Sequence, residues 1–193
     1  MKHVLLSLSA VVLSLSLAGA ETYSVDPAHS SVNFTIRHLV GKVTGGFGRF
    51  DASFDYDAKD PKSWKADATI QAASINTGIQ KRDDHLRSAD FFDVAKHPTL
   101  AFKSAGVTDV KGNKAKLHGD LTMHGVTRPV VLDLEINGPI KDPWGGTRVG
   151  AAAAGKVNRK DFGISYNKVL DAGGLMLGDE VDIVINIEAA AKK

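Results

Sequence analysis

Ser31-Val32-Asn33-Phe34-Thr35-Ile36-Arg37-His38 places polar side chains at every odd position, while the even positions are apolar until His38. Successive side chains of a β-strand point to opposite faces of a sheet, so this two-residue period indicates a strand with one buried face. A helix would instead repeat its apolar residues every three to four positions. The octapeptide therefore predicts a β-strand and sets the pattern by which the rest of the chain is interpreted.

The same alternation recurs along the chain, and turn-forming residues separate its occurrences. It covers residues 50–56, 64–71, 115–123, 130–136 and 181–187, with a short strand at 100–103 and a strand rich in glycine and alanine at 147–157. Together with 31–38 these segments predict about eight strands, connected mainly by short turns and hence antiparallel. The fold class is all-β, either a closed barrel or a two-sheet sandwich.

Small side chains recur on the faces predicted to point inward, which favours a cavity inside such a barrel. Examples are Ala52, Ala66, Ala68, Ala151 and Ala153. An eight-stranded barrel is wide enough to hold side chains or one slender ligand. The alternative is that bulky neighbouring side chains fill the interior.

Residues 1–20 have the pattern of a secretory signal peptide. Lys2 precedes an uncharged apolar stretch, and Ala18-Gly19-Ala20 supplies the small residues that signal peptidase requires. We expect export through the Sec pathway, cleavage after Ala20 and a single mature domain over 21–193. The apolar stretch is short and contains serines, so no stable membrane anchor is expected.

The composition excludes several classes of function. The net charge is +2, and no basic run interleaved with aromatic residues is present, so we expect no nucleic-acid partner. The chain has no cysteine, which excludes thiolate nucleophiles and thiolate metal ligands. Stability must then come from a core rather than from disulfides.

The densest group of ionisable residues is Arg82-Asp83-Asp84-His85-Leu86-Arg87-Ser88-Ala89-Asp90-Phe91-Phe92-Asp93. Thr77 followed by Gln80 resembles a capping box, and Asp83 and Asp84 lie at helical ion-pair spacing from Arg87. We therefore predict one short helix over about 78–90 at the barrel rim, ended by Phe91 and Phe92.

This run also suggests an alternative function, a metal-assisted hydrolase that uses His85 with Asp83 or Asp84. The helix offers only one histidine, and the two acids are predicted to pair with arginine, so we assign no catalytic residue and no metal ligand. The other histidines are scattered along the chain, although a barrel can bring some of them together. Within the predicted mature chain they are His29, His38, His97, His118 and His124.

Several ordered motifs resemble the YceI family of secreted bacterial proteins. Besides the run from Arg82 to Phe92, they include Gly119-Asp120-Leu121-Thr122-Met123-His124-Gly125-Val126-Thr127-Arg128-Pro129-Val130. Segments 23–32, 34–39, 45–50, 159–164 and 178–181 agree with the same family, so the resemblance spans nearly the whole mature chain.

The resemblance implies a lipocalin-like, eight-stranded antiparallel barrel whose apolar tunnel holds a polyisoprenoid or a prenylated quinone-like lipid. It implies a periplasmic binding protein rather than an enzyme, with no cofactor besides this ligand, and it leaves a homodimer open. The candidate tunnel-lining residues lie on the alternating strands: Phe34, Ile36, His38, Phe50, Phe54, Leu117, Leu121, Met123, Leu132, Leu134, Ile183 and Ile185.

Overall fold

The computed structural model describes residues 20–171 and 173–192. The predicted signal peptide falls almost entirely on residues 1–19, which lie outside the described residues. No helix in the described ranges is long and apolar enough to cross a membrane. The strands are β1 (Glu21–Val25), β2 (Ser31–His38), β3 (Gly41–Phe47), β4 (Phe50–Tyr56), β5 (Lys65–Gln71), β6 (Ile75–Asn76), β7 (Thr99–Lys111), β8 (Lys114–Met123), β9 (Val126–Lys141), β10 (Thr147–Asn158) and β11 (Leu177–Ala191).

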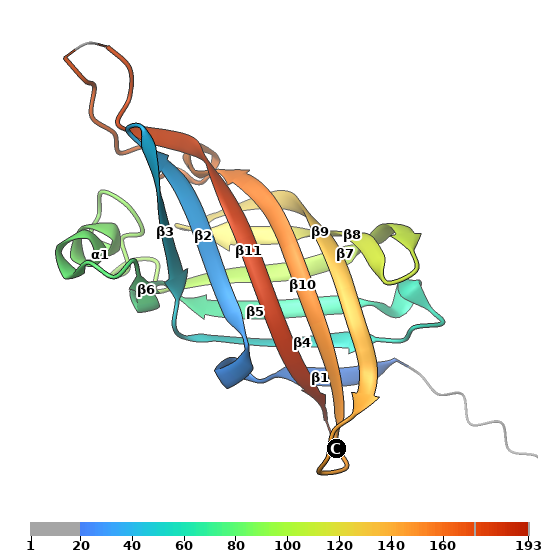
Figure 1. The fold of residues 1–193 in the computed structure, drawn as a ribbon. Coiled ribbons are helices and arrows are strands. Elements are labelled where there is room, and N and C mark those ends of the chain that lie inside the picture. The colour runs from blue at the N-terminus through green and yellow to red at the C-terminus, as the bar shows by residue number, and fades with distance from the viewer. Residues whose placement is uncertain (1–19, 172, 193) are drawn as a thin grey trace, which may run out of the picture.

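All strand pairings between these elements are antiparallel. Along the sheet the order runs β1-β4-β5-β7-β8-β9-β10-β11, and β11 pairs again with β1. These eight strands of the described chain therefore form a closed ring, which confirms the predicted barrel and excludes an open sandwich. Figure 1 shows β2, β3, β9, β10 and β11 crossing in front of β4, β5 and β7.

The β2–β3 hairpin extends the ring at one end. β2 pairs with the first part of β11, whereas β1 pairs with its last residues, and the short 3₁₀ helix η1 (Pro27–His29) interrupts the strand between them. β3 leads directly into β4. On its outer edge β3 pairs only with β6, through Gly46 and Phe47, so 41–44 have no strand partner there among the described residues.

Three strands, β1, β3 and the two-residue β6, were not among the segments predicted from alternation. β3 does not show the alternation because glycine occupies positions 45 and 46, where apolar side chains would otherwise mark a buried face. A Cβ at Gly45 would lie 2.6 Å from Phe34 Cζ, and one at Gly46 would lie 2.6 Å from Asn33 Oδ1. Side chains of β2 thus cross β3 and occupy the space that a larger residue would need.

The single α-helix of the described chain, α1 (Gln80–Arg87), is shorter than the predicted 78–90. Ile79 precedes its first turn without a side-chain cap, so the predicted capping box of Thr77 and Gln80 is wrong. Instead, the carboxylate of Asp83 accepts hydrogen bonds from the backbone N–H and the hydroxyl of Thr77. Asp83 therefore ties the helix to the segment before it, rather than pairing with Arg87.

Candidate ligand-binding site

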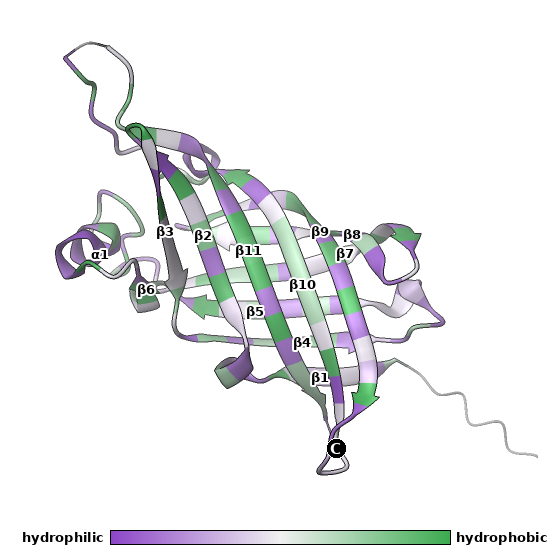
Figure 2. Ribbon diagram, viewed as in Figure 1, coloured by the Kyte–Doolittle hydropathy of each residue, from purple (hydrophilic) through white to green (hydrophobic). Residues whose placement is uncertain are grey.

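An internal cavity of about 740 Å³ lies within the barrel. Its walls come from the inward faces of the strands, where the alternation visible along β2 and β11 in Figure 2 places the apolar residues. All twelve residues predicted from the sequence lie on this wall: Phe34, Ile36, His38, Phe50, Phe54, Leu117, Leu121, Met123, Leu132, Leu134, Ile183 and Ile185. Their contact with a ligand stays a prediction.

Small side chains account for much of the free volume. The wall includes Ala52 on β4, Ala66 and Ala68 on β5, and Ala151 and Ala153 on β10. Each faces the interior, where a leucine or phenylalanine would extend into the cavity. The sequence-based alternative, an interior filled by its own bulky side chains, is therefore wrong for this barrel.

A cluster of aromatic side chains closes one end of the cavity. Tyr23, Tyr56 and Trp64 are buried there, and the ring of Tyr23 stacks on Phe54 at a centroid distance of 5.4 Å. The Tyr23 hydroxyl donates to the carboxylate of Glu21, and burial together with this neighbour raises the pKa of the phenol well above its ordinary value. The cluster forms an apolar floor in which the Tyr23 hydroxyl and the Trp64 indole N–H each donate a hydrogen bond.

The opposite end is covered by α1 and by the loops that flank it. The ring of Tyr166 lies 4.9 Å from His85 and 5.0 Å from Phe91, measured between ring centroids. Phe92 meets Phe47 of β3 edge to face at 5.7 Å. The prediction that Phe91 and Phe92 anchor the exit of the helix is confirmed, and all five rings also line the cavity.

Several positively charged groups border the cavity at this covered end. Lys81 and Arg82 of α1 and Lys168 of the loop before β11 border the cavity, as does His38 at the end of β2. Arg82 is held in place because its guanidinium donates to the hydroxyl and carbonyl oxygens of Thr77. A ligand with a long apolar tail and a polar head can therefore place its head at this rim.

Arg159 is a lining residue that strand alternation did not identify. It is 3% exposed, and its guanidinium donates to the carbonyl oxygens of Ile164, Tyr166 and Gly178 and to Asp179. Burial lowers its pKa, and the nearby Asp179 carboxylate partly offsets that effect. Its only signal in the sequence is the motif at 159–164, which marks the family but not this role.

The charged run around α1 does not converge on a reactive centre. His85 Nε2 lies 2.7 Å from Asp90 Oδ2, Asp83 is engaged by Thr77, and Asp84 pairs with Gln80 and Arg87. His85, Asp83 and Asp84 form no cluster that could share a metal ion within the described ranges. These three side chains therefore face separate partners rather than one common point.

Comparison with known proteins agrees with this architecture. The family model described as "YceI-like domain" matches residues 23–189. Protein YceI of Escherichia coli O157:H7 is 40% identical over the full length of both chains. The crystal structure of the Campylobacter jejuni YceI protein is 34% identical, with a TM-score of 0.69, over 81% of this chain and 90% of that one.

A more distant structure has the same fold. A polyisoprenoid-binding domain from Saccharophagus degradans is 17% identical and superposes with a TM-score of 0.68 over 88% of this chain and 98% of its own. The extent of the family match and the full-length identity to the E. coli protein together decide the assignment. The chain belongs to the YceI-like family.

Proposed function

We propose that the protein is a periplasmic binding protein that holds the tail of a long apolar lipid, a polyisoprenoid or a prenylated quinone-like molecule, inside its barrel. The observation that carries this proposal is the cavity of about 740 Å³ with its apolar wall. Each methylene moved from water into such a cavity contributes about 0.8 kcal/mol, so a prenyl tail needs few polar contacts to bind tightly.

The polyisoprenoid-binding domain of S. degradans supports this ligand class, because it shares the fold. Binding is favoured over catalysis because the acids and the histidine of α1 are engaged by neighbouring groups rather than directed at one point. The predicted signal peptide at 1–20 supports the periplasmic location.

The ligand is tested by extracting lipid from protein purified from its native host and identifying it by mass spectrometry. Delipidated protein is then titrated with a fluorescent prenyl probe. We expect co-purified prenyl lipid and saturable uptake of the probe. A barrel that is isolated without lipid and takes up no probe contradicts the proposal.

A matched pair of variants on β10 tests whether the cavity itself is the site. Ala153→Phe places a ring in the cavity, whereas Ala154→Phe places the same ring on the opposite, exposed face. We expect the first variant to lose probe binding by at least about tenfold and the second to bind like the wild type. Equal binding by both would mean that the probe binds elsewhere.

The location is tested separately, by expressing the full chain in a Gram-negative host and fractionating the cells. Mass spectrometry of the periplasmic protein should find Glu21 as its first residue. Retention of an uncleaved chain in the cytoplasm would contradict the location without affecting the lipid assignment.

A further inference from the structure

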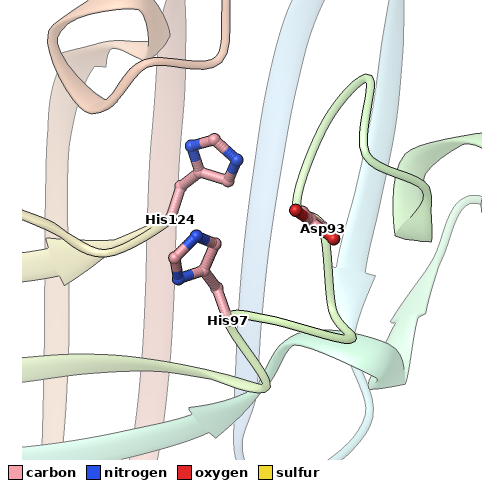
Figure 3. A group of neighbouring side chains, drawn as sticks. All are labelled: Asp93, His97 and His124. Atoms are coloured by element: carbon pink, nitrogen blue, oxygen red, sulfur yellow. The ribbon is translucent and has the colours of Figure 1, made fainter.

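Three potential metal ligands lie together outside the cavity. Asp93 and His97 come from the segment that connects α1 to β7, and His124 comes from the turn between β8 and β9 (Figure 3). One ligand atom from each lies within 4.8 Å of the other two. We propose that these residues form a binding site for a divalent transition-metal ion of the Zn²⁺ type.

The backbone positions Asp93 and His97 on one turn. The carbonyl oxygen of Asp93 accepts a hydrogen bond from the His97 N–H at 2.8 Å, and the Asp93 N–H donates to the carbonyl of Ser88 at 2.9 Å. Asp93 itself has a φ of +43°, a left-handed conformation that is uncommon outside glycine. The turn thus holds a carboxylate and an imidazole, four residues apart, toward the same point.

His124 occupies the first position of the two-residue turn His124-Gly125. Both residues have positive φ, +53° and +75°, as a tight hairpin turn requires. Asparagine or aspartate is the usual choice before the glycine of such a turn, so a histidine is a departure from the preferred turn chemistry. A Cβ at Gly125 would lie 2.7 Å from His97 Cε1, which shows that the His97 ring packs directly on this turn.

The hydrogen bonding of His124 prepares one of its nitrogens for a metal. Its Nδ1 lies 3.1 Å from the carbonyl oxygen of Phe162. Because a carbonyl only accepts, Nδ1 carries the proton, and the lone pair of neutral imidazole is on Nε2. In a metal-binding histidine, the ring nitrogen that does not bind the metal usually donates to a backbone carbonyl or a carboxylate. This hydrogen bond fixes both the tautomer and the orientation of the ring.

Within the described ranges, the carboxylate of Asp93 is paired through one oxygen only. Its Oδ2 pairs with Lys96 Nζ at 3.0 Å, but the Lys96 side chain is 74% exposed, whereas that of Asp93 is 13% exposed. The exposed ammonium can move into water, and Oδ1 is available in either case. The Asp93 carboxylate is therefore positioned by the backbone of its turn rather than by Lys96.

Two imidazoles and one carboxylate form a donor set suited to Zn²⁺, with a fourth position for water. Bonds of about 2.0–2.2 Å require ligand atoms within about 4 Å of one another, so small side-chain rotations suffice to close the site. A second cluster, Asp26, His29 and Glu188, is less suitable. There, Arg148 Nη1 lies 3.1 Å from each carboxylate and supplies the positive charge itself.

A bound ion would connect two parts of the molecule that are far apart in the sequence. Asp93 and His97 follow Phe91 and Phe92 in the segment that covers the cavity, and His124 belongs to the barrel. The metal would fasten this cover to the barrel and raise the temperature of unfolding, because it binds only the folded arrangement. This inference does not depend on what occupies the cavity.

The test uses the mature chain without a polyhistidine tag, freed of metal by dialysis against a chelator. Calorimetric titration with ZnCl₂ should show one ion per chain, accompanied by a rise in the unfolding temperature, while MgCl₂ should give neither. His97→Ala and His124→Asn should each weaken binding by at least about tenfold and abolish the thermal shift. Asparagine is chosen at 124 because it tolerates the left-handed turn.

His29→Ala and His118→Ala serve as controls, because His29 belongs to the second cluster and His118 lies on the exposed face of β8. Both should bind Zn²⁺ like the wild type. The proposal is overturned if the wild type binds Zn²⁺ more weakly than about 1 mM, if the His97→Ala variant keeps full affinity, or if His29→Ala abolishes binding.

Discussion

The ring of Phe102 on β7 lies directly over Gly119 on β8. A Cβ at Gly119 would be 2.4 Å from Phe102 Cζ and 2.7 Å from the carbonyl oxygen of Lys103. Phe102 lines the cavity, so the missing side chain at Gly119 lets the ring lie against the wall instead of filling the interior.

Gly119→Ala should therefore destabilise the protein by about 1–3 kcal/mol, because one of the two contacts is with backbone and cannot be relieved by rotating the ring. Urea unfolding measures the loss. Gly150→Ala on β10 is the matched control, since the atoms nearest to its Cβ lie 3.8 Å away. Equal stability of the two variants would show that the atoms around Gly119 move enough to accommodate a methyl group.

Arg159→Met should lower the free energy of unfolding by about 3 kcal/mol. Methionine keeps much of the apolar volume but leaves the carbonyls of Ile164, Tyr166 and Gly178 without their donor. Lys160→Met is the control, because Lys160 pairs with the same Asp179 from an exposed position and should change stability by less than about 1 kcal/mol. Thermal or urea unfolding of both variants measures the difference. Equal losses of stability in Arg159→Met and Lys160→Met would show that the Arg159 guanidinium does not stabilise the fold.

The pair His29 and Asp26 should make a small contribution to stability that depends on pH. The hydrogen bond and charge of Asp26 raise the pKa of His29 above its ordinary 6.5, and His29 and Arg148 lower the pKa of Asp26 below its ordinary 3.8. The contribution of His29 is complete below pH 6.5 and is lost as the pH rises through its folded pKa. That of Asp26 is complete above pH 3.8 and is lost on acidification through its own folded pKa.

An NMR titration of the His29 ring measures this effect directly. Asp26→Asn should bring its pKa down, whereas Asp182→Asn, which removes a carboxylate paired with Lys42 and Lys156, should leave it unchanged. A His29 pKa that is insensitive to Asp26→Asn would show that the pair does not persist in solution.

Asp83→Ala should loosen the cover of the cavity. The 4% exposed carboxylate accepts both hydrogen bonds from Thr77, so its removal should cost about 2 kcal/mol and speed the release of a bound prenyl probe. Asp84→Ala, at a largely exposed side chain, should alter neither quantity much. Stopped-flow displacement measures the release rate, and identical rates for the two variants would contradict a role for Asp83 in closing the barrel.

The alternation of polar and apolar residues predicted the faces of the strands well, because one face of each is buried against the cavity and the other is in water. It therefore placed residues such as Phe34, Leu121 and Leu132 correctly on the wall. It did not mark β3, where Gly45 and Gly46 make room for side chains of β2. The ends of α1 were also misjudged, because the contact of Asp83 with Thr77 replaces a standard cap.

The alternation could not predict which residues from distant segments the fold brings together. His97 and His124 lie in separate connections, and only the pairing of β7 with β8 and of β8 with β9 brings those connections close. Arg159 likewise reaches the cavity from the short 3₁₀ helix η4 (Arg159–Phe162) after β10, through contacts that no local periodicity encodes.

The outer edge of β3 at 41–44, which no strand of the described chain joins, borders the cavity through Val43. Exposed strand edges tend to add strands from other molecules, and a lysine on the edge opposes this. Lys42 is such a residue, with a side chain that is 67% exposed. Lys42 therefore opposes the addition of a strand from another molecule at a stretch that also borders the cavity.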